Sequence, residues 1–239
     1  MKIFAHRGAS GAYPENTILA FQKAVEAGAD GVEFDLHRTR DGVLVVHHDF
    51  DLERTASVSL VIAESDYADL AQYDLGAWKG KFPKQTLPTL EEVLAVFRGT
   101  EMMINIELKA GSGIYPGIEA QLLEVLKQEG NPKRFILSSF DHHALMKLRS
   151  LGSPHPLGVL TEARLIAPWV YVETHHFQTY HPYFRTLDPE AIKELKARKI
   201  PVYTYTVNKA RAAKRLMDWG IDGIITNWPE KIKEKLQIK

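Results

Sequence analysis

Two short segments of the chain carry acidic side chains at alternating positions. Glu33 and Asp35 alternate with apolar residues in the first segment, and Asn105 and Glu107 do so in the second. Because alternate residues of a β-strand point to the same side, three carboxylates are expected on the polar faces of two strands. Carboxylates gathered in a barrel repel one another unless a cation neutralises them. All-oxygen ligation favours Mg²⁺ or Ca²⁺, with Mn²⁺ also possible, over zinc.

Imidazole groups end two further segments that read as strands. His6 ends the first apolar run of the chain, and His47 and His48 end another. Imidazole titrates near neutrality, so it can take a proton from a nucleophile or give one to a leaving group. Arg7 can bind phosphate oxygens through its planar fork, and Lys109 can add a point charge. A metal, two histidines and a guanidinium together indicate phosphoester cleavage.

These side chains need a scaffold of alternating strands and helices, and the apolar patterning predicts one. Nine strands are expected for the eight places of a barrel, and the Val170–Glu173 candidate is the weakest because the polar, aromatic stretch after it could be a rim loop. The nine are Ile3–His6, Gly31–Leu36, Val43–His48, Met103–Leu108, Arg134–Ser138, Leu157–Leu160, Val170–Glu173, Pro201–Thr206 and Gly223–Thr226.

Helices are predicted where amphipathic segments follow residues that cap helix N-termini. They are Ile18–Ala27 after Asn16, Leu90–Arg98 after Thr89 with Glu92 at the capping-box position, and Pro189–Arg198 after Asp188. The alternation of strands and helices continues to the C-terminus, and no glycine-rich phosphate loop follows the first strand. The sequence therefore favours an α/β fold of the TIM (β/α)8 barrel type over a doubly wound sheet.

Two features interrupt this regular pattern. Only a few residues around Arg40-Asp41-Gly42 join the second and third strands, too few for a crossover helix, so we expect an irregular, hairpin-like connection there. Residues 49–88, about forty with no strong periodicity, are expected to form a small insertion over the barrel mouth. We predict one domain over residues 1–239 that includes this insertion.

The composition limits the classes of partner. The 239 residues include 30 Lys and Arg against 30 Asp and Glu, so no net positive charge attracts nucleic acid or membrane surfaces. The absence of cysteine excludes thiol nucleophiles and disulfides. No apolar run approaches the roughly 20 residues of a membrane span, and the N-terminus turns polar too early for a secretory signal. We expect a cytoplasmic enzyme with a small-molecule substrate and neither nucleic-acid binding nor stable membrane insertion; its oligomeric state stays open.

A set of motifs, taken in order, resembles the glycerophosphodiester phosphodiesterase family over nearly the whole chain. No single motif is specific, but the ordered set is very specific. The motifs are HRGA (6–9), PENT (14–17), EFD (33–35), DG (41–42), VHHD (46–49), LERT (52–55), DLGAW (74–78), LPTLEE (87–92) and ELK (107–109). The resemblance implies a TIM barrel with an insertion after the third strand.

The same resemblance implies roles for individual residues. Glu33, Asp35 and Glu107 would bind the metal, and His6 and His48 would form the acid/base pair. The expected reaction is hydrolysis of a glycerophosphodiester to glycerol 3-phosphate and an alcohol such as choline or ethanolamine. The sequence leaves open which histidine is the acid. It also leaves open whether the nucleophile is water or the substrate's own 2-hydroxyl group.

Other residues are expected to be peripheral. Opposite parity lets only one of His47 and His48 face the lumen, and the His-Asp pairing of the family favours His48. His37 is expected to be a salt-bridge partner beyond the end of its strand. Substrate-rim positions are predicted for His176, Phe177 and Tyr180.

The last strands depart from the family pattern, because Tyr205 stands where Trp is usual and Asn227 where Asp is usual. These positions shape the rim, so the headgroup preference stays open. Two alternatives within the phosphodiesterases are a lysophospholipase D-like and a phosphoinositide-lipase-like enzyme, both of which need an apolar surface near the mouth. A barrel that only binds phosphorylated ligands is a third alternative, which the intact histidines and carboxylates disfavour.

Overall fold

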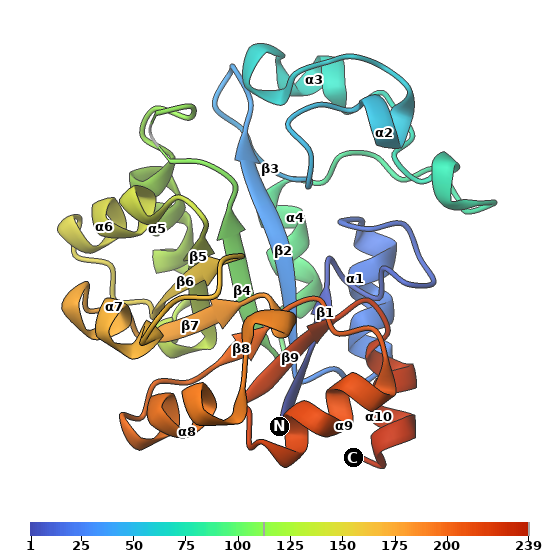
Figure 1. Ribbon diagram of the computed structural model, residues 1–239. Coiled ribbons are helices and arrows are strands. Elements are labelled where there is room, and N and C mark those ends of the chain that lie inside the picture. Colours follow the sequence, from blue (N-terminus) through green and yellow to red (C-terminus); the bar gives the residue numbers. More distant parts are fainter. Residues whose placement is uncertain (112, 239) are drawn as a thin grey trace.

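A computed structural model describes residues 1–111 and 113–238. Within them, eight parallel strands form a barrel surrounded by helices (Figure 1). These strands are β1 (Lys2–His6), β2 (Gly31–Arg38), β4 (Met103–Leu108), β5 (Phe135–Ser139), β6 (Leu157–Thr161), β7 (Thr179–Pro182), β8 (Tyr203–Thr204) and β9 (Gly223–Thr226). The expected TIM barrel is confirmed.

The barrel closes between its two edge strands. The hydrogen-bonded order is β7-β6-β5-β4-β2-β1-β9-β8, and parallel bridges then join Tyr180 to Val202 and Tyr183 to Tyr205 across β7 and β8. The backbone amide of Phe184 also donates to the carbonyl of Tyr205 over 2.9 Å. Closure brings the carboxyl ends of all eight strands to one rim, where the side chains that follow each strand can meet.

The main helices that cover the barrel are α1 (Ile18–Glu26), α4 (Leu90–Phe97), α5 (Ile118–Glu129), α6 (His142–Ser150), α7 (Pro168–Thr174), α8 (Pro189–Ala197), α9 (Ala210–Asp218) and α10 (Pro229–Leu236). Thr89 and Glu92 form the predicted capping box of α4, and Asp188 caps α8. The prediction for α1 is wrong by one residue, because the Thr17 side chain is the cap and Asn16 turns toward the barrel. No helix among the described residues is long and apolar enough to span a membrane.

The weakest of the expected strands is absent, and another strand takes its place. Val170–Glu173 was predicted as a strand, but it lies in α7, which begins at Pro168. The strand that completes the eight of the barrel is instead β7, which lies within the stretch that we expected to be a rim loop. The β-branched residues of α7 resemble a strand, while buried polar residues such as Thr179 and His181 hide the alternation of β7.

The alternation predicted for β2 and β4 is confirmed by their two faces. Val32 and Phe34 of β2 point outward and pack under the helices, as do Ile104 and Ile106 of β4. The floor of the barrel is closed by a small apolar cluster that consists of Phe4, Ile136, Tyr203 and Ile225. The carboxylates of Glu33, Asp35 and Glu107 lie above this floor, nearer the carboxyl ends of the strands.

The predicted irregularity after β2 is present. Strand β3 (Leu44–Val46) pairs with β2 in antiparallel fashion and lies off the barrel path. The segment that follows contains the short helices α2 (Glu53–Ala56) and α3 (Tyr67–Leu70) and has a small core of its own (Figure 1). Lys79 of this segment donates to the Ser10 carbonyl over 2.9 Å, which ties the insertion to the loop after β1. That residues 1–239 form a single domain stays a prediction.

Candidate active site

Three carboxylates meet inside the barrel near its rim. In the strand register Asp35 of β2 lies beside Glu107 of β4, and Glu33 lies beside Asn105. Glu33, Asp35 and Glu107 each offer a ligand oxygen, and these oxygens all lie within 4.8 Å of one another. All three side chains are buried. The convergence expected from strand parity is therefore present.

The charges in this cluster conflict with one another. Burial, together with the neighbouring Asp35 and Glu107, raises the pKa of Glu33 well above its usual value. Burial and Asp35 raise the pKa of Glu107 to about 7. Burial alone would raise the pKa of Asp35 as well, but the charges of Arg7 and Lys109 lower it. The cluster therefore needs further positive charge to hold three ionised carboxylates near neutral pH.

The donor atoms of the cluster fit a hard divalent cation. They are carboxylate oxygens only, which suits Mg²⁺, Ca²⁺ or Mn²⁺. The buried side-chain oxygen of Asn105, beside Glu33 in the register, has no hydrogen-bond partner within the described residues. A buried oxygen without a partner is costly, so it adds to the demand for a cation in this region.

The turn after β1 aims Arg7 at the carboxylates. Arg7 has a φ of 55°, and its backbone amide donates to the Glu33 carbonyl over 2.8 Å. Gly8 follows with a φ of 80°, and a Cβ there would lie 2.6 Å from the Ala20 carbonyl carbon of α1. Only glycine permits this backbone conformation so close to the helix. The side chain of Asn16 then donates to Asp35 over 2.8 Å.

Two cations surround the acidic cluster. Arg7 Nε lies 3.2 Å from Asp35 Oδ2, and Arg7 Nη1 lies 2.9 Å from Glu15 Oε1. Lys109 Nζ lies 2.9 Å from Glu107 and 3.4 Å from Asp35. Both cations line the same cavity of about 170 Å³. They are in position to neutralise an anion bound there.

The two candidate histidines line this cavity from different sides. His6 Nδ1 is 2.6 Å from the side-chain oxygen of Asn227, and its Nε2 is 3.8 Å from Glu33. Burial, followed by the charge of Arg7, lowers the pKa of His6 to about 3. His48 Nδ1 is 2.8 Å from Asp49 Oδ1, and burial lowers the pKa of His48 too. The imidazoles therefore have different partners, one an amide and the other a carboxylate.

The other histidines of this region have structural contacts. His47 is buried and its Nε2 is 3.1 Å from the Asp51 carbonyl, so it packs outside the cavity while His48 lines it. His37 lies inside β2, and the prediction that it is a salt-bridge partner is wrong. Its imidazole contacts the Tyr115 hydroxyl at 2.5 Å and the His48 carbonyl at 3.3 Å. His37 thus holds the backbone of His48.

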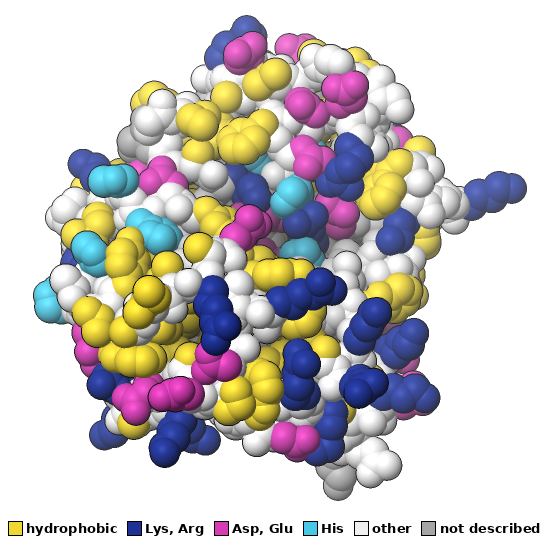
Figure 2. Space-filling model, viewed as in Figure 1, with side chains coloured by type: hydrophobic (Ala, Val, Ile, Leu, Met, Phe, Trp, Pro, Cys, Tyr) yellow, Lys and Arg dark blue, Asp and Glu magenta, His cyan; other side chains and the backbone are white. Residues whose placement is uncertain are grey.

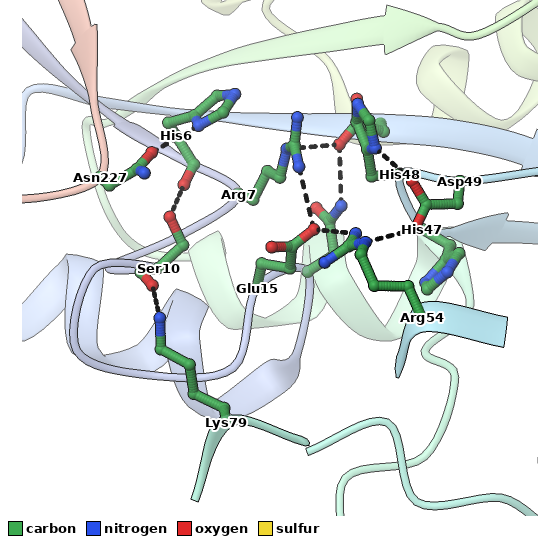
Figure 3. Close-up of polar contacts among 12 residues, drawn as sticks. His6, Arg7, Ser10, Glu15, His47, His48, Asp49, Arg54, Lys79 and Asn227 are labelled. Carbon is green, nitrogen blue, oxygen red and sulfur yellow. Dashed lines mark hydrogen bonds and ion pairs between the residues drawn. The ribbon is translucent and has the colours of Figure 1, made fainter. Parts of the chain in front are cut away.

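Sequence reasoning missed an ion-pair network behind the site (Figure 3). Arg54 of the insertion contacts Asp49 at 2.6 Å and Glu15 at 2.7 Å. Glu15 contacts Arg7, and Asp49 contacts His48, so the network joins both sides of the cavity. Its members lie in the motifs HRGA, PENT, VHHD and LERT, but the pairing could not be predicted because these motifs come from separate loops.

The predicted rim residues do not line the cavity. His176 and Phe177 precede β7, at the amino ends of the strands, where Gln178 bonds to the first residue of β6. Tyr180 is buried, and its hydroxyl group accepts a hydrogen bond from the Thr161 hydroxyl over 3.0 Å. The prediction that these residues lie at the substrate rim is wrong, because it assumed a rim loop in a stretch where the chain forms strand β7. The additional residues that line the cavity include Phe140, Leu160, Glu162, Tyr205 and Thr206.

Comparison with known proteins agrees with this geometry. A sequence model described as the glycerophosphoryl diester phosphodiesterase family matches residues 6–231. A glycerophosphodiester phosphodiesterase of Caldanaerobacter subterraneus subsp. tengcongensis is 35% identical over 96% of this chain and 95% of its own length. One from Bacillus altitudinis is 37% identical over 99% of both chains. The solved structure of an Oleispira antarctica phosphodiesterase with the product sn-glycerol-3-phosphate is 31% identical, with a TM-score of 0.93 over 99% of this chain and 97% of that one.

Proposed function

The chain belongs to the glycerophosphoryl diester phosphodiesterase family, and from this membership we propose that it hydrolyses glycerophosphodiesters to glycerol 3-phosphate and an alcohol. The proposal includes dependence on one divalent cation and acid/base catalysis by His6 and His48. A small-molecule substrate and a cytoplasmic location, both expected from the sequence, are part of it.

One observation carries the catalytic part of this proposal. The ligand oxygens of Glu33, Asp35 and Glu107 lie within 4.8 Å of one another, and His6 and His48 line the cavity beside them. A divalent cation held by these three carboxylates would polarise the phosphoryl group.

Arg7 and Lys109 bind the phosphate group in this proposal. Both side chains carry positive charge into the cavity and are only partly exposed. Charge-assisted hydrogen bonds from them would neutralise the oxygens of the phosphoryl group as negative charge builds up. Glu15 and Asp35 hold the guanidinium of Arg7 in position.

The hydrogen-bond partners support different roles for the two histidines. When Nδ1 of His6 carries the proton, it donates to the neutral amide oxygen of Asn227 and leaves Nε2 as an acceptor. His6 is then the base. The carboxylate of Asp49 stabilises a protonated His48, so His48 is the acid that protonates the leaving oxygen.

The test measures release of glycerol 3-phosphate from glycerophosphoglycerol, with and without a chelator. We expect His6→Ala, His48→Ala and Glu107→Ala each to reduce kcat by a factor of about 100 or more. His143→Ala, which removes an exposed histidine of α6, should retain full activity. Turnover that resists the chelator, or full activity of the three variants, would contradict the proposed site.

The nucleophile is tested with a modified substrate. A substrate whose glycerol lacks the 2-hydroxyl group cannot form a cyclic phosphate. If the 2-deoxy analogue is hydrolysed at an unchanged rate, water is the nucleophile. If it is bound but not cleaved, the reaction passes through the cyclic intermediate.

A second candidate function is favoured by apolar side chains near the mouth. Phe50, Ile114 and Phe140 are between 42% and 52% exposed and lie on loops that follow strands β3, β4 and β5. Such a surface could contact the acyl chain of a lysophospholipid. Comparison of lysophosphatidylglycerol with glycerophosphoglycerol tests this: a higher kcat/KM for the lysophospholipid would favour lysophospholipase D activity, and no turnover would exclude it.

A further inference from the structure

A large second cavity adjoins the catalytic cavity at the barrel rim. Its volume is about 790 Å³, against about 170 Å³ for the cavity that holds the catalytic residues. Ligand cavities measure roughly 300–1,000 Å³, so the small one by itself is short of space for a whole diester. The two cavities share Glu162, Tyr205 and Thr206 as lining residues. The larger cavity therefore provides adjoining space for the part of a diester that the small cavity cannot hold.

The larger cavity is basic. Arg185, Lys209 and Arg215 line it, and Glu162, at the boundary with the catalytic cavity, is the one acidic residue among its described lining residues. None of the three cations forms an ion pair in the part of the chain that the structure describes. In Figure 2, basic and apolar side chains lie beside the hollow that contains acidic and histidine side chains. The cavity is thus suited to an anion.

Two of the four aromatic residues that line this cavity, Phe184 and Trp219, do not suit a quaternary ammonium group. Such a group binds to the open face of an aromatic ring. Here the Arg185 guanidinium lies 5.6 Å from the centroid of Phe184, and that of Arg215 lies 5.1 Å from the centroid of Trp219. Both rings already have a cation near them, so a choline group would meet positive charge there.

The loop that carries Lys209 is attached to the catalytic residues. The side-chain oxygen of the preceding Asn208 accepts from the backbone amide of Asn227 over 2.9 Å. Asn227 in turn contacts His6 at 2.6 Å. The residue that precedes Lys209 is therefore held next to the site, which favours a role of Lys209 in substrate recognition.

We propose that the larger cavity binds the leaving alcohol and selects glycerophosphodiesters whose alcohol carries a further phosphate group. This inference rests on the proposed function, which it extends from the reaction to the substrate class. Arg185, Lys209 and Arg215 bind the second phosphate group, while Glu33, Asp35 and Glu107 serve the phosphodiester that is cleaved. Hydrolysis adds one water and releases glycerol 3-phosphate and the phosphate-bearing alcohol.

The test compares three substrates. Bis(glycerophospho)glycerol carries a second phosphate on its alcohol, glycerophosphoglycerol has the same alcohol without it, and glycerophosphocholine has a cationic alcohol. After correction for the two equivalent ester groups of the first, we expect its kcat/KM to exceed that of the other two by about tenfold, from the ion pairs that Arg185, Lys209 and Arg215 make with the second phosphate. This preference should decrease as NaCl is raised from 0.05 to 0.5 M.

Variants separate this cavity from the catalytic residues. Arg185→Gln and Lys209→Gln should each lower kcat/KM for bis(glycerophospho)glycerol by about twofold and leave glycerophosphoglycerol unchanged. Arg211→Gln, an exposed cation of α9 outside the cavity, is the matched control and should change neither value. Thermal unfolding verifies that each variant is folded.

Three results would overturn the inference. They are a preference for glycerophosphocholine, equal losses on both substrates in the variants, and an effect of Arg211→Gln as large as that of Lys209→Gln. Failure of the proposed function has a different signature. In that case none of the three substrates is hydrolysed, or hydrolysis persists in His6→Ala and Glu107→Ala, and this inference falls with it.

Discussion

The buried imidazole of His181 should make the stability of the protein depend on pH. His181 lies on β7 and is fully buried, with Nε2 2.9 Å from the Thr179 hydroxyl. Its Nδ1 has no partner among the described residues. Burial lowers the pKa of His181 from 6.5 to about 3. The folded protein therefore holds this imidazole neutral at pH values where the unfolded chain would protonate it.

The sign and size of the effect follow from proton linkage. Below pH 6.5 the unfolded chain binds one more proton at His181 than the folded protein does, so stability falls as the pH falls. The slope is about 1.4 kcal/mol per pH unit until the pH approaches the folded pKa. Between pH 7.5 and pH 5 the loss from this one group is therefore about 2 kcal/mol.

The assay is urea unfolding followed by tryptophan fluorescence at pH 7.5 and pH 5. His181→Leu keeps a similar side-chain volume and removes the titrating group. We expect the variant to lose about 2 kcal/mol less stability over this interval than the wild type. His143→Leu, which replaces an exposed histidine, is the control. If His181→Leu and the wild type lose the same stability between the two pH values, the reasoning is refuted.

Three further predictions concern the site and the turn that builds it. Glu107→Gln should weaken Mn²⁺ binding at least about tenfold, as measured by titration calorimetry; unchanged affinity would remove Glu107 from the ligand set. His48→Ala should lose about 100-fold in kcat on glycerophosphoglycerol but far less on a p-nitrophenyl diester, whose leaving group needs no proton; equal losses would argue against His48 as the acid. Gly8→Ala should lower the free energy of unfolding by about 2–4 kcal/mol in urea, because its Cβ would lie 2.6 Å from the Ala20 backbone at a φ of 80°; a stability equal to that of the wild type would contradict the packing argument.

Strand periodicity predicted part of the site, and a short apolar run without clear periodicity led to an error in the fold. Glu33, Asp35 and Glu107 lie on alternate positions of β2 and β4, and a local rule was enough to place them on one face. Val170–Glu173 was misassigned because a short apolar run fits a buried strand and a helix equally well. The true strand β7 carries polar residues toward the lumen, so it lacked the apolar signal of the others.

The sequence alone did not predict the contacts between distant loops. Asn227 stood out only as a departure from the family pattern, and its contact with His6 spans 221 positions. The pairing of Arg54 with Glu15 joins the insertion to the loop after β1. His37 seemed to lie beyond its strand, but β2 continues to Arg38 and buries it. Each contact depends on how loops fold back over the rim, for which no local pattern exists.

The sequence by itself determined the alternation of strands and helices, the face on which each carboxylate lies, and the family to which the ordered motifs point. These properties follow from residues that are neighbours along the chain, where the period of a strand or helix is fixed by backbone geometry. Only the tertiary structure decided which side chains meet across the rim. Closure of β8 against β7 brings Tyr205 and Glu162 to the boundary between the catalytic cavity and the basic cavity. That closure depends on burying the apolar faces of all eight strands together, which no single segment encodes.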